Sequence, residues 1–115
     1  LTAMTASAEY GPYGGLEHYM KLGYVPIDRE PEAASKTVEY AFDDWTIARM
    51  AEKMGKKDVA ATYYKRAQNY RNVFDRETGF IRARKSTGEF RTPFDPAQSN
   101  FGSDYTEGSA WQYSW

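Results

Sequence analysis

The feature that most constrains the fold is a helical pattern of apolar residues at positions 36–54. Small and apolar side chains recur there at intervals of three and four residues, which is the period of one face of an α-helix. These side chains are Val38, Ala41, Trp45, Ala48 and either Ala51 or Met54. Ser35 stands in the N-cap position, and Gly55 follows where a left-handed backbone ends a helix. We therefore expect one long amphipathic helix that needs an apolar partner.

A second helix is predicted directly afterwards, at residues 59–74, with Asp58 as its N-cap. Its expected buried face consists of Ala60, Tyr63 or Tyr64, Ala67, Tyr70 and Phe74. Because the connecting loop is short, the two helices should form an antiparallel αα-hairpin. Tetratricopeptide-like solenoids and (α/α)6 toroids both stack such hairpins, so the hairpin does not choose between them. No second copy follows at a period of about 34 residues, which disfavours the solenoid.

The N-terminal third should alternate short helices with loops. Residues 1–9 lack helix breakers, and residues 10–15 contain three glycines and a proline, so a helix end and a connecting loop are expected. Residues 16–22 form a short predicted helix that carries His18, the only histidine, which we expect to be a structural or surface residue. Residues 23–31 should be extended or turned, because two prolines restrict the backbone.

The C-terminal third contains mostly turn-forming residues. Residues 75–79 predict a turn, and two short runs at 80–84 and 89–92 flank a loop that contains glycine. This pattern indicates a small β-hairpin on a helical scaffold. Residues 92–103 carry two prolines and should form a long loop that leads into the last eleven residues.

Carboxylates within the first long helix are unusual. Adjacent aspartates, Asp43 and Asp44, are poor residues for a helix interior. Glu39 and Asp43 share one face at a spacing of four residues, and Tyr40 and Asp44 share the next face. These side chains form either a solvated acidic face or the polar lining of an inner cavity.

Glu107 is the leading candidate for a catalytic residue, because it lies among two tryptophans and two tyrosines in the segment 105–115. Crowding by apolar rings would raise the pKa of its carboxyl and keep a proton that a general acid can donate. Thr106 could instead cap a helix that begins at residue 108 or 109, and the positive end of that helix would favour the carboxylate. A first-turn glutamate at the start of a buried aromatic helix is the alternative.

Composition excludes several functional classes. The 15 basic and 16 acidic side chains give a formal net charge of -1, so there is no electrostatic basis for binding nucleic acid or an anionic membrane. No apolar run approaches the roughly 18 residues that span a bilayer. The chain has no cysteine, which excludes disulfides and thiolate chemistry. Leu1 is not an initiator methionine and Trp115 falls within an apolar helical pattern, so we expect a piece of a longer chain.

Four ordered segments resemble glycoside hydrolase family 92, the calcium-dependent exo-acting α-mannosidases. They are Gly-Tyr-Val-Pro at 23–26, Thr-Val-Glu-Tyr-Ala-Phe-Asp-Asp-Trp at 37–45, Thr-Pro-Phe-Asp-Pro at 92–96 and Tyr-Thr-Glu-Gly-Ser-Ala-Trp-Gln-Tyr-Ser-Trp at 105–115. Ser109 stands where the family usually has asparagine. The resemblance implies a mainly α fold, with residues 1–115 forming a fragment of one helical catalytic domain, part of an (α/α)6 toroid with antiparallel hairpins and a small β-hairpin or loop insertion.

The resemblance also implies an activity. The parent enzyme would remove terminal α-linked mannose from N-glycan-type mannosides with inversion, with Glu107 as general acid. The residues expected to bind substrate are Tyr24, Asp43, Asp44, Trp45, Tyr105, Trp111 and Gln112. The catalytic base and the main calcium ligands would come from later segments, so this fragment alone should be inactive. The parent would be secreted, periplasmic or on the cell surface. The competing interpretation is a non-catalytic tetratricopeptide-like interaction module.

Overall fold

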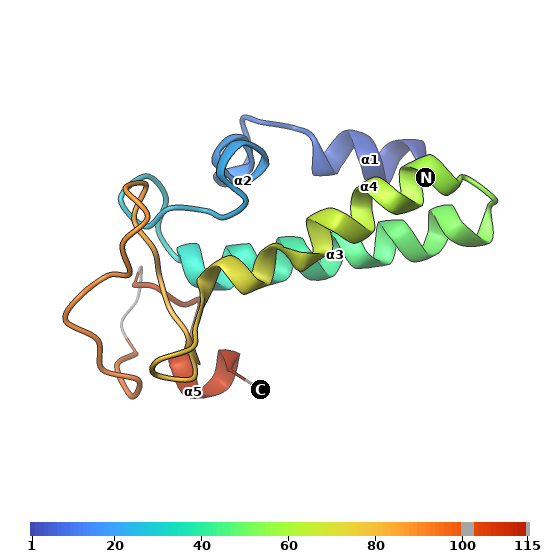
Figure 1. Cartoon of the computed structure of the whole chain (residues 1–115). Helices are drawn as coiled ribbons and strands as arrows, with labels where there is room; N and C mark the ends of the chain where they lie inside the picture. The colour runs from blue at the N-terminus through green and yellow to red at the C-terminus, as the bar shows by residue number, and fades with distance from the viewer. Residues whose placement is uncertain (100–102, 115) are drawn as a thin grey trace.

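The computed structural model describes residues 1–99 and 103–114 and is mainly helical. In chain order the elements are α1 (Thr2–Ala8), α2 (Leu16–Leu22), α3 (Ala33–Lys53), α4 (Lys57–Ala67), the 3-10 helix η1 (Gln68–Val73), β1 (Phe74–Asp75), β2 (Phe80–Ile81) and α5 (Ala110–Tyr113). Figure 1 shows α3 and α4 as the long central pair, with α1 and α2 on one side and α5 on the other. The predicted loop positions 100–102 and the helical position of Trp115 lie outside the described residues.

The predicted αα-hairpin is confirmed, since α3 and α4 run antiparallel and pack along their length. Gly55 adopts φ 73° after α3, as expected. The N–H of Gly55 donates to Glu52 O at 3.0 Å, and the N–H of Lys56 donates to Ala51 O at 2.8 Å. These two bonds make a Schellman motif, which satisfies the last carbonyls of α3 and turns the chain back.

Both predicted N-caps of this hairpin are wrong. Helix α3 begins at Ala33 with Glu32 as its N-cap, so Ser35 lies inside the helix. A side-chain cap is not needed there, because the N–H groups of Ala34 and Ser35 in the first turn donate to Asp104 O, and that of the N-cap Glu32 donates to Ser103 O. Helix α4 has Lys56 as its N-cap, and Asp58 lies in its first turn. A negative charge there stabilises the helix, because it interacts favourably with the positive end of the helix dipole.

The buried face of α3 is only partly the predicted one. Ala41, Ala48 and Ala51 are buried as expected, but Trp45 remains 44% exposed and Met54 52% exposed. Small alanines let neighbouring helices approach closely, and this leaves the larger rings outside the contact. On that outer surface Trp45 stacks on Phe42 with ring centroids 6.0 Å apart.

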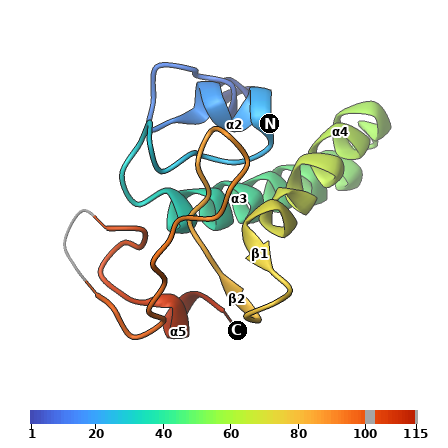
Figure 2. The same ribbon diagram turned by 60° about the vertical axis from the view of Figure 1, so that its left-hand side comes forward.

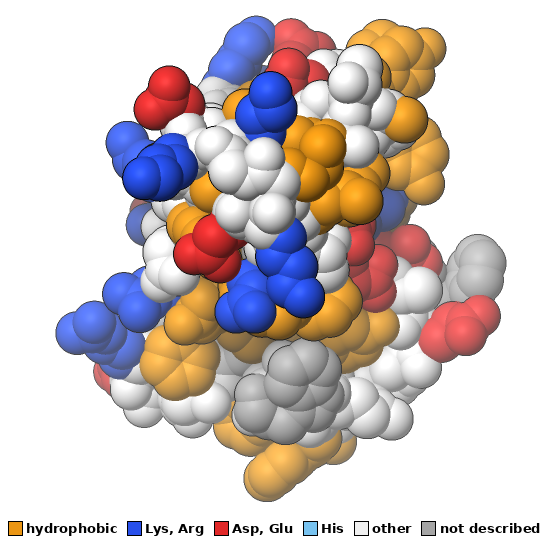
Figure 3. All heavy atoms as spheres, turned by 90° about the vertical axis from the view of Figure 1, so that its right-hand side faces the viewer, with side chains coloured by type: hydrophobic (Ala, Val, Ile, Leu, Met, Phe, Trp, Pro, Cys, Tyr) orange, Lys and Arg blue, Asp and Glu red, His pale blue; other side chains and the backbone are white. Residues whose placement is uncertain are grey.

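The second helix is shorter than predicted, because its α-helical part ends at Ala67 and tightens into η1. Ala60, Tyr63 and Ala67 are buried as expected, whereas Tyr70 and Phe74 are exposed. Phe74 belongs to β1 and not to a helix, which removes it from the helical face. Figure 3 views the molecule from the side of the α3–α4 turn, where Lys and Arg side chains gather on the left and in the centre and exposed apolar side chains gather at the upper right.

The predicted β-hairpin is present in part, and another short hairpin precedes it. β1 and β2 pair antiparallel in the register Phe74↔Ile81 and Asp75↔Phe80, so the predicted turn at 75–79 is itself the hairpin turn. The runs predicted to pair with each other do so around the antiparallel bridge Arg84↔Phe90. On either side of it, Lys85 N–H donates to Glu89 O at 2.8 Å and Arg91 N–H donates to Ala83 O at 2.9 Å. The N-terminal predictions are confirmed, because helices occupy Thr2–Ala8 and Leu16–Leu22 with a loop between them.

One apolar cluster joins the two halves of the chain. It lies at the end of the molecule where Figure 2 shows the β-hairpin and α5 next to the start of α3. Its buried members are Tyr24, Ala34, Val73, Ile81, Ala83, Tyr105 and Ala110. This cluster lies where the start of α3, the β-hairpin and α5 meet, so it fixes the C-terminal segment onto the helical pair. Within the described residues, no helix is both long and apolar enough to cross a lipid bilayer.

Candidate functional site

The C-terminal segment is anchored by Tyr105. Its side chain is only 3% exposed, and its ring stacks on that of Tyr113 with centroids 5.7 Å apart. The Tyr105 hydroxyl donates to the carbonyl oxygen of Ile81 on β2. Both the ring and the hydroxyl of Tyr105 are used inside the core, so its contacts do not support the predicted substrate-binding role.

Thr106 follows, and both of its backbone groups are bound by side chains. Its N–H donates to Ser35 Oγ at 2.8 Å, and its carbonyl oxygen accepts from the Tyr113 hydroxyl at 2.8 Å. Ser35 belongs to α3 and Tyr113 to α5. Two elements distant in sequence thus fix the residue directly before Glu107.

Glu107 is exposed and adopts φ 51°. The predicted crowding of its carboxyl by aromatic rings is wrong for the described residues, because the rings pack against one another. Tyr105 stacks on Tyr113, and Trp111 lies edge-on to Phe80 with centroids 5.0 Å apart. Among residues 1–99 and 103–114, no hydrogen bond or ion pair involves the Glu107 carboxylate. Its assignment as general acid stays a prediction.

The sequence suggested Thr106 as the cap of this last helix, but the N-cap of α5 is Ser109. The Oε1 atom of Gln112 accepts hydrogen bonds from the backbone N–H and, at 2.9 Å, the hydroxyl of Ser109. This capping box uses the side-chain oxygen of Gln112, which was predicted to bind substrate. Trp111, the other predicted contact on α5, is 66% exposed and so presents a free ring face.

Gly108 has a steric role between Glu107 and this cap. A Cβ at position 108 would lie 3.0 Å from Gln112 Oε1 and 3.2 Å from Tyr113 Cε2. These distances are tighter than ordinary van der Waals contact. A glycine therefore lets α5 fold back closely against the backbone that carries Glu107.

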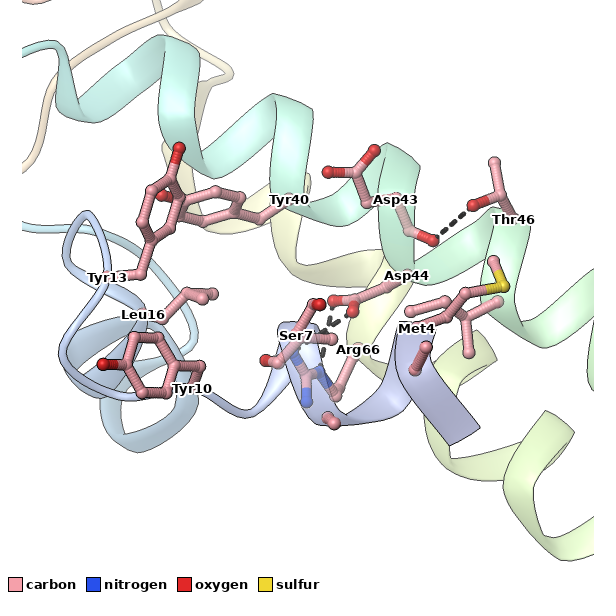
Figure 4. A pocket seen from close by; sticks show the side chains of 14 residues that line it. Met4, Ser7, Tyr10, Tyr13, Leu16, Tyr40, Asp43, Asp44, Thr46 and Arg66 are labelled. Atoms are coloured by element: carbon pink, nitrogen blue, oxygen red, sulfur yellow. Dashed lines mark hydrogen bonds and ion pairs between the residues drawn. The ribbon is translucent and has the colours of Figure 1, made fainter. Parts of the chain in front are cut away.

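The predicted carboxylates of α3 lie in a different place, a cavity of about 830 Å³ between α1, α2 and α3 (Figure 4). Side chains that line it include Tyr10, Tyr13, Tyr40, Asp43, Asp44 and Arg66. Asp44 is 1% exposed, whereas Asp43 is exposed at the rim. The inner-cavity alternative is thus the one that the structure shows for Asp44 and Tyr40, whereas Asp43 lies at the solvent-exposed rim. Glu39 remains on the exposed surface.

The Asp44 carboxylate is fully engaged by the protein. It accepts from the Tyr19 hydroxyl at 2.7 Å and from Arg66 Nε at 3.2 Å, and Arg66 Nη2 lies 3.2 Å from its second oxygen. Figure 4 shows Asp44 pointing to Arg66 while the side chain of Asp43 points away. Burial raises the pKa of Asp44, although Tyr19 and Arg66 favour the charged carboxylate. Asp44 is therefore placed to hold helices together.

Two other predicted contact residues lie apart from these groups. Tyr24 is 6% exposed and its hydroxyl donates to Lys85 O at 2.8 Å, so its side chain is packed in the core. Trp45 lies on the exposed surface of α3 under Arg49, whose guanidinium carbon is 5.6 Å from the ring centroid.

The predicted site residues therefore do not form one site. Asp43 and Asp44 line the cavity together with residues of α1 and α2. Helix α5, which follows Glu107 closely in the sequence, lies on the other side of α3 from α1 and α2 (Figure 1). Sequence reasoning missed Ser35 and Tyr113, which hold Thr106. In the sequence, a serine next to an apolar helical pattern could have indicated a buried hydrogen-bonding residue, but Ser35 was interpreted as an N-cap.

Within the described residues, no group of three or more acidic or histidine side chains is placed to hold a metal ion. Calcium favours six to eight oxygen ligands, and carboxylates usually supply several of them. The described residues thus do not fit a calcium site of their own.

The sequence model of the glycosyl hydrolase family 92 catalytic domain matches residues 1–115. A family GH92 α-mannosidase from Bacteroides thetaiotaomicron is similar, with a TM-score of 0.95 and 44% identity over 99% of this chain and 15% of that chain. A structure of this α-mannosidase with mannoimidazole gives a TM-score of 0.95 and 42% identity over 99% and 16% of the two chains. An inverting mannosidase of the same family, from Bacteroides thetaiotaomicron VPI-5482, gives a TM-score of 0.80 and 49% identity over 84% of this chain and 13% of that chain. No curated protein matches. The chain spans 15% of the length of the first of these solved relatives.

Proposed function

Because the chain belongs to glycosyl hydrolase family 92, we propose that it is part of an enzyme that removes terminal α-linked mannose from N-glycan-type mannosides with inversion. The match over all 115 residues is the observation that carries this proposal. Solved relatives described as α-mannosidase and as inverting mannosidase support the bond class and the stereochemistry. The match to a catalytic domain disfavours the non-catalytic helical-repeat alternative.

Glu107 is proposed as the general acid. Inverting hydrolysis needs one carboxylic acid at the leaving oxygen and a second carboxylate, about 6.5–9.5 Å away, that activates water. Glu107 is exposed within this chain, and the N–H and the carbonyl of Thr106, directly before it, are held by Ser35 and Tyr113. A glutamate at φ 51° is an uncommon conformation that is typical of functional positions.

Neighbouring side chains suggest how the sugar would be oriented. Trp111 presents an exposed ring four residues after Glu107, and an aromatic face can pack on the apolar face of a pyranose. Gln112 would contribute its amide NH2 group, because its oxygen is used by the cap. Contacts of substrate with Asp43, Asp44 and Trp45 stay predictions and would require a second surface, on the other side of α3.

The larger context is proposed from the family. The α3–α4 hairpin would be one hairpin of an (α/α)6 toroid, in a parent that is secreted, periplasmic or on the cell surface. The catalytic base and the calcium ligands would come from other parts of the parent chain. Bound calcium would supply a hard cation for sugar hydroxyls, with its main ligands outside the residues described above.

The test compares two mannosides in the full-length parent enzyme carrying Glu107→Gln. This change keeps the shape of the side chain but removes the transferable proton, and general acid catalysis is worth about 10²–10⁴-fold. Turnover of an α-mannobiose should fall by that factor. Turnover of a mannoside with a strongly acidic phenol as leaving group should fall much less, because that leaving group needs little protonation.

Glu89→Gln is the matched control, since Glu89 is an exposed glutamate in the loop after β2. It should leave the turnover of both substrates unchanged. Equal loss of both activities in Glu107→Gln, with an unchanged thermal melt, would show that Glu107 is not the acid.

A further inference from the structure

The start of α3 holds the backbone that leads to Glu107. The N–H groups of Glu32 and Ala34 donate to Ser103 O at 2.8 Å and to Asp104 O at 3.1 Å. The N–H of Ser35 points to the same Asp104 oxygen at 3.5 Å. N–H groups of a first helical turn have no partner within their own helix, so this contact satisfies both segments at once.

Two side chains continue this attachment by one residue, to Thr106. Ser35 Oγ accepts from Thr106 N–H, and the Tyr113 hydroxyl donates to Thr106 O, each at 2.8 Å. Ser35 is 0% exposed, and the Tyr113 ring stacks on the buried ring of Tyr105. Water therefore cannot take the place of either hydroxyl unless the surrounding side chains repack.

Backbone strain concentrates at this junction. Glu32, at φ 57°, and Glu107, at φ 51°, are the two residues other than glycine with positive φ among those that the structure describes. Glu32 donates to Ser103, and Glu107 follows Thr106, so they lie at the two ends of one hydrogen-bonded junction. Such conformations persist only where the surroundings determine them, and here the surrounding bonds are those of Ser35 and Tyr113.

We propose that Ser35 and Tyr113 are positioning residues that hold the carboxyl of Glu107 at the leaving oxygen, an inference that rests on the proposed function. A general acid must lie within hydrogen-bond reach of the oxygen that it protonates. Loss of either hydroxyl frees one side of Thr106, so the peptide plane that precedes Glu107 can tilt through the φ and ψ angles on either side of it. The two residues act on the orientation of the acid and make no contact with substrate.

The test uses Ser35→Ala and Tyr113→Phe in the full-length parent enzyme, each with a matched control. Thr37→Val is the control for Ser35, because Thr37 is equally buried in α3 but its hydroxyl accepts from Val25 N–H and donates to Ala33 O. Tyr63→Phe is the control for Tyr113, since the Tyr63 hydroxyl donates to Glu9, on the other side of α3. The controls remove comparable hydroxyl groups without touching Thr106.

The expected result is a selective loss in kcat. Both Thr106-binding variants should turn over α-mannobiose about 10- to 100-fold more slowly, the cost typical of misplacing a catalytic group by about 1 Å. They should lose several-fold less on a mannoside with an acidic phenol leaving group, and KM should change little. The control variants should affect both substrates equally or not at all.

Equal losses on both substrates, or no loss, would overturn the positioning role of the residue concerned. If Ser35→Ala does not fold in thermal melting, Tyr113→Phe decides, because it keeps the stacked ring. Glu107→Gln, measured alongside, separates the two proposals. A selective loss in Glu107→Gln without one in either positioning variant refutes only the positioning role, whereas an unselective loss in Glu107→Gln refutes the acid assignment and this inference with it.

Discussion

At the scale of single residues, Ser109 shows how a motif can change letter and keep its physical role. The family resemblance places asparagine at this position, and both serine and asparagine are strong N-cap residues. In the structure Ser109 is the N-cap of α5 and shares a capping box with Gln112. The departure from the family pattern therefore leaves the local fold intact.

This interpretation predicts different effects for two substitutions of Ser109. Ser109→Ala removes the cap and should lower the free energy of unfolding by about 0.5–2 kcal/mol, whereas Ser109→Asn should change it by only a few tenths. Urea denaturation of both variants measures the difference. Similar destabilisation by alanine and asparagine would show that the hydroxyl of Ser109 acts in some other way.

At the scale of elements, Asp44 joins four helices. It lies on α3, accepts from Tyr19 of α2 and pairs with Arg66 of α4, and Arg66 also donates to Ala8 O of α1 at 2.9 Å. Loss of one partner in a buried ion pair leaves the other charge without compensation. The helix arrangement therefore depends on one of two adjacent aspartates.

We predict that Asp44→Ala lowers the free energy of unfolding by about 3–5 kcal/mol. Its neighbour supplies the control, because Asp43 is exposed and Asp43→Ala should change stability by no more than about 0.5 kcal/mol. Both values come from urea denaturation at pH 7. A larger effect at Asp43 than at Asp44 would contradict the helix-joining role.

The free energy of unfolding should depend on pH through Asp75 in the β-hairpin. Burial alone would raise the pKa of this carboxyl, but hydrogen bonds from Thr78, Arg82 and the Glu77 N–H outweigh it and hold the pKa below its ordinary value. A lowered folded-state pKa stabilises the fold above the unfolded-state pKa, and this contribution is lost as the pH falls through the folded-state pKa.

Asp75→Asn should therefore lower the free energy of unfolding at pH 7 by about 1–3 kcal/mol. The difference from the unchanged protein should shrink as the pH falls below about 4. Denaturation series at pH 7, 5 and 3 test this directly. A difference that stays constant over this range would mean that the charge of Asp75 does not stabilise the hairpin.

Helical periodicity predicted most of these elements but not their contacts. The spacing of alanines identified α3, and Gly55 identified its end, because both depend on local geometry. The exposure of Trp45 depends on which face the other helices cover, and no local pattern contains that information. The true start of α3 was missed for the same reason, since its N–H groups are satisfied by Ser103 and Asp104, about 70 residues later.

At the scale of the whole molecule, the predicted site residues divide between the two sides of α3. Sequence proximity to a motif identified Glu107 and Trp111 on one side, while adjacent carboxylates identified the cavity around Asp44 on the other. The chain spans 15% of the length of a solved relative, so the catalytic base and most sugar contacts are expected from other segments of the parent. What this chain contributes, in our account, is an acid on a backbone that α3 and α5 hold in place.

The most direct test of that account is a crystal structure of the full-length parent bound to an α-mannobioside in which sulfur replaces the glycosidic oxygen. We predict that a carboxyl oxygen of Glu107 lies within hydrogen-bond reach of that sulfur, while Thr106 keeps its bonds to Ser35 and Tyr113. A sulfur atom bound by another carboxyl group, with Glu107 directed away from the sugar, would contradict it.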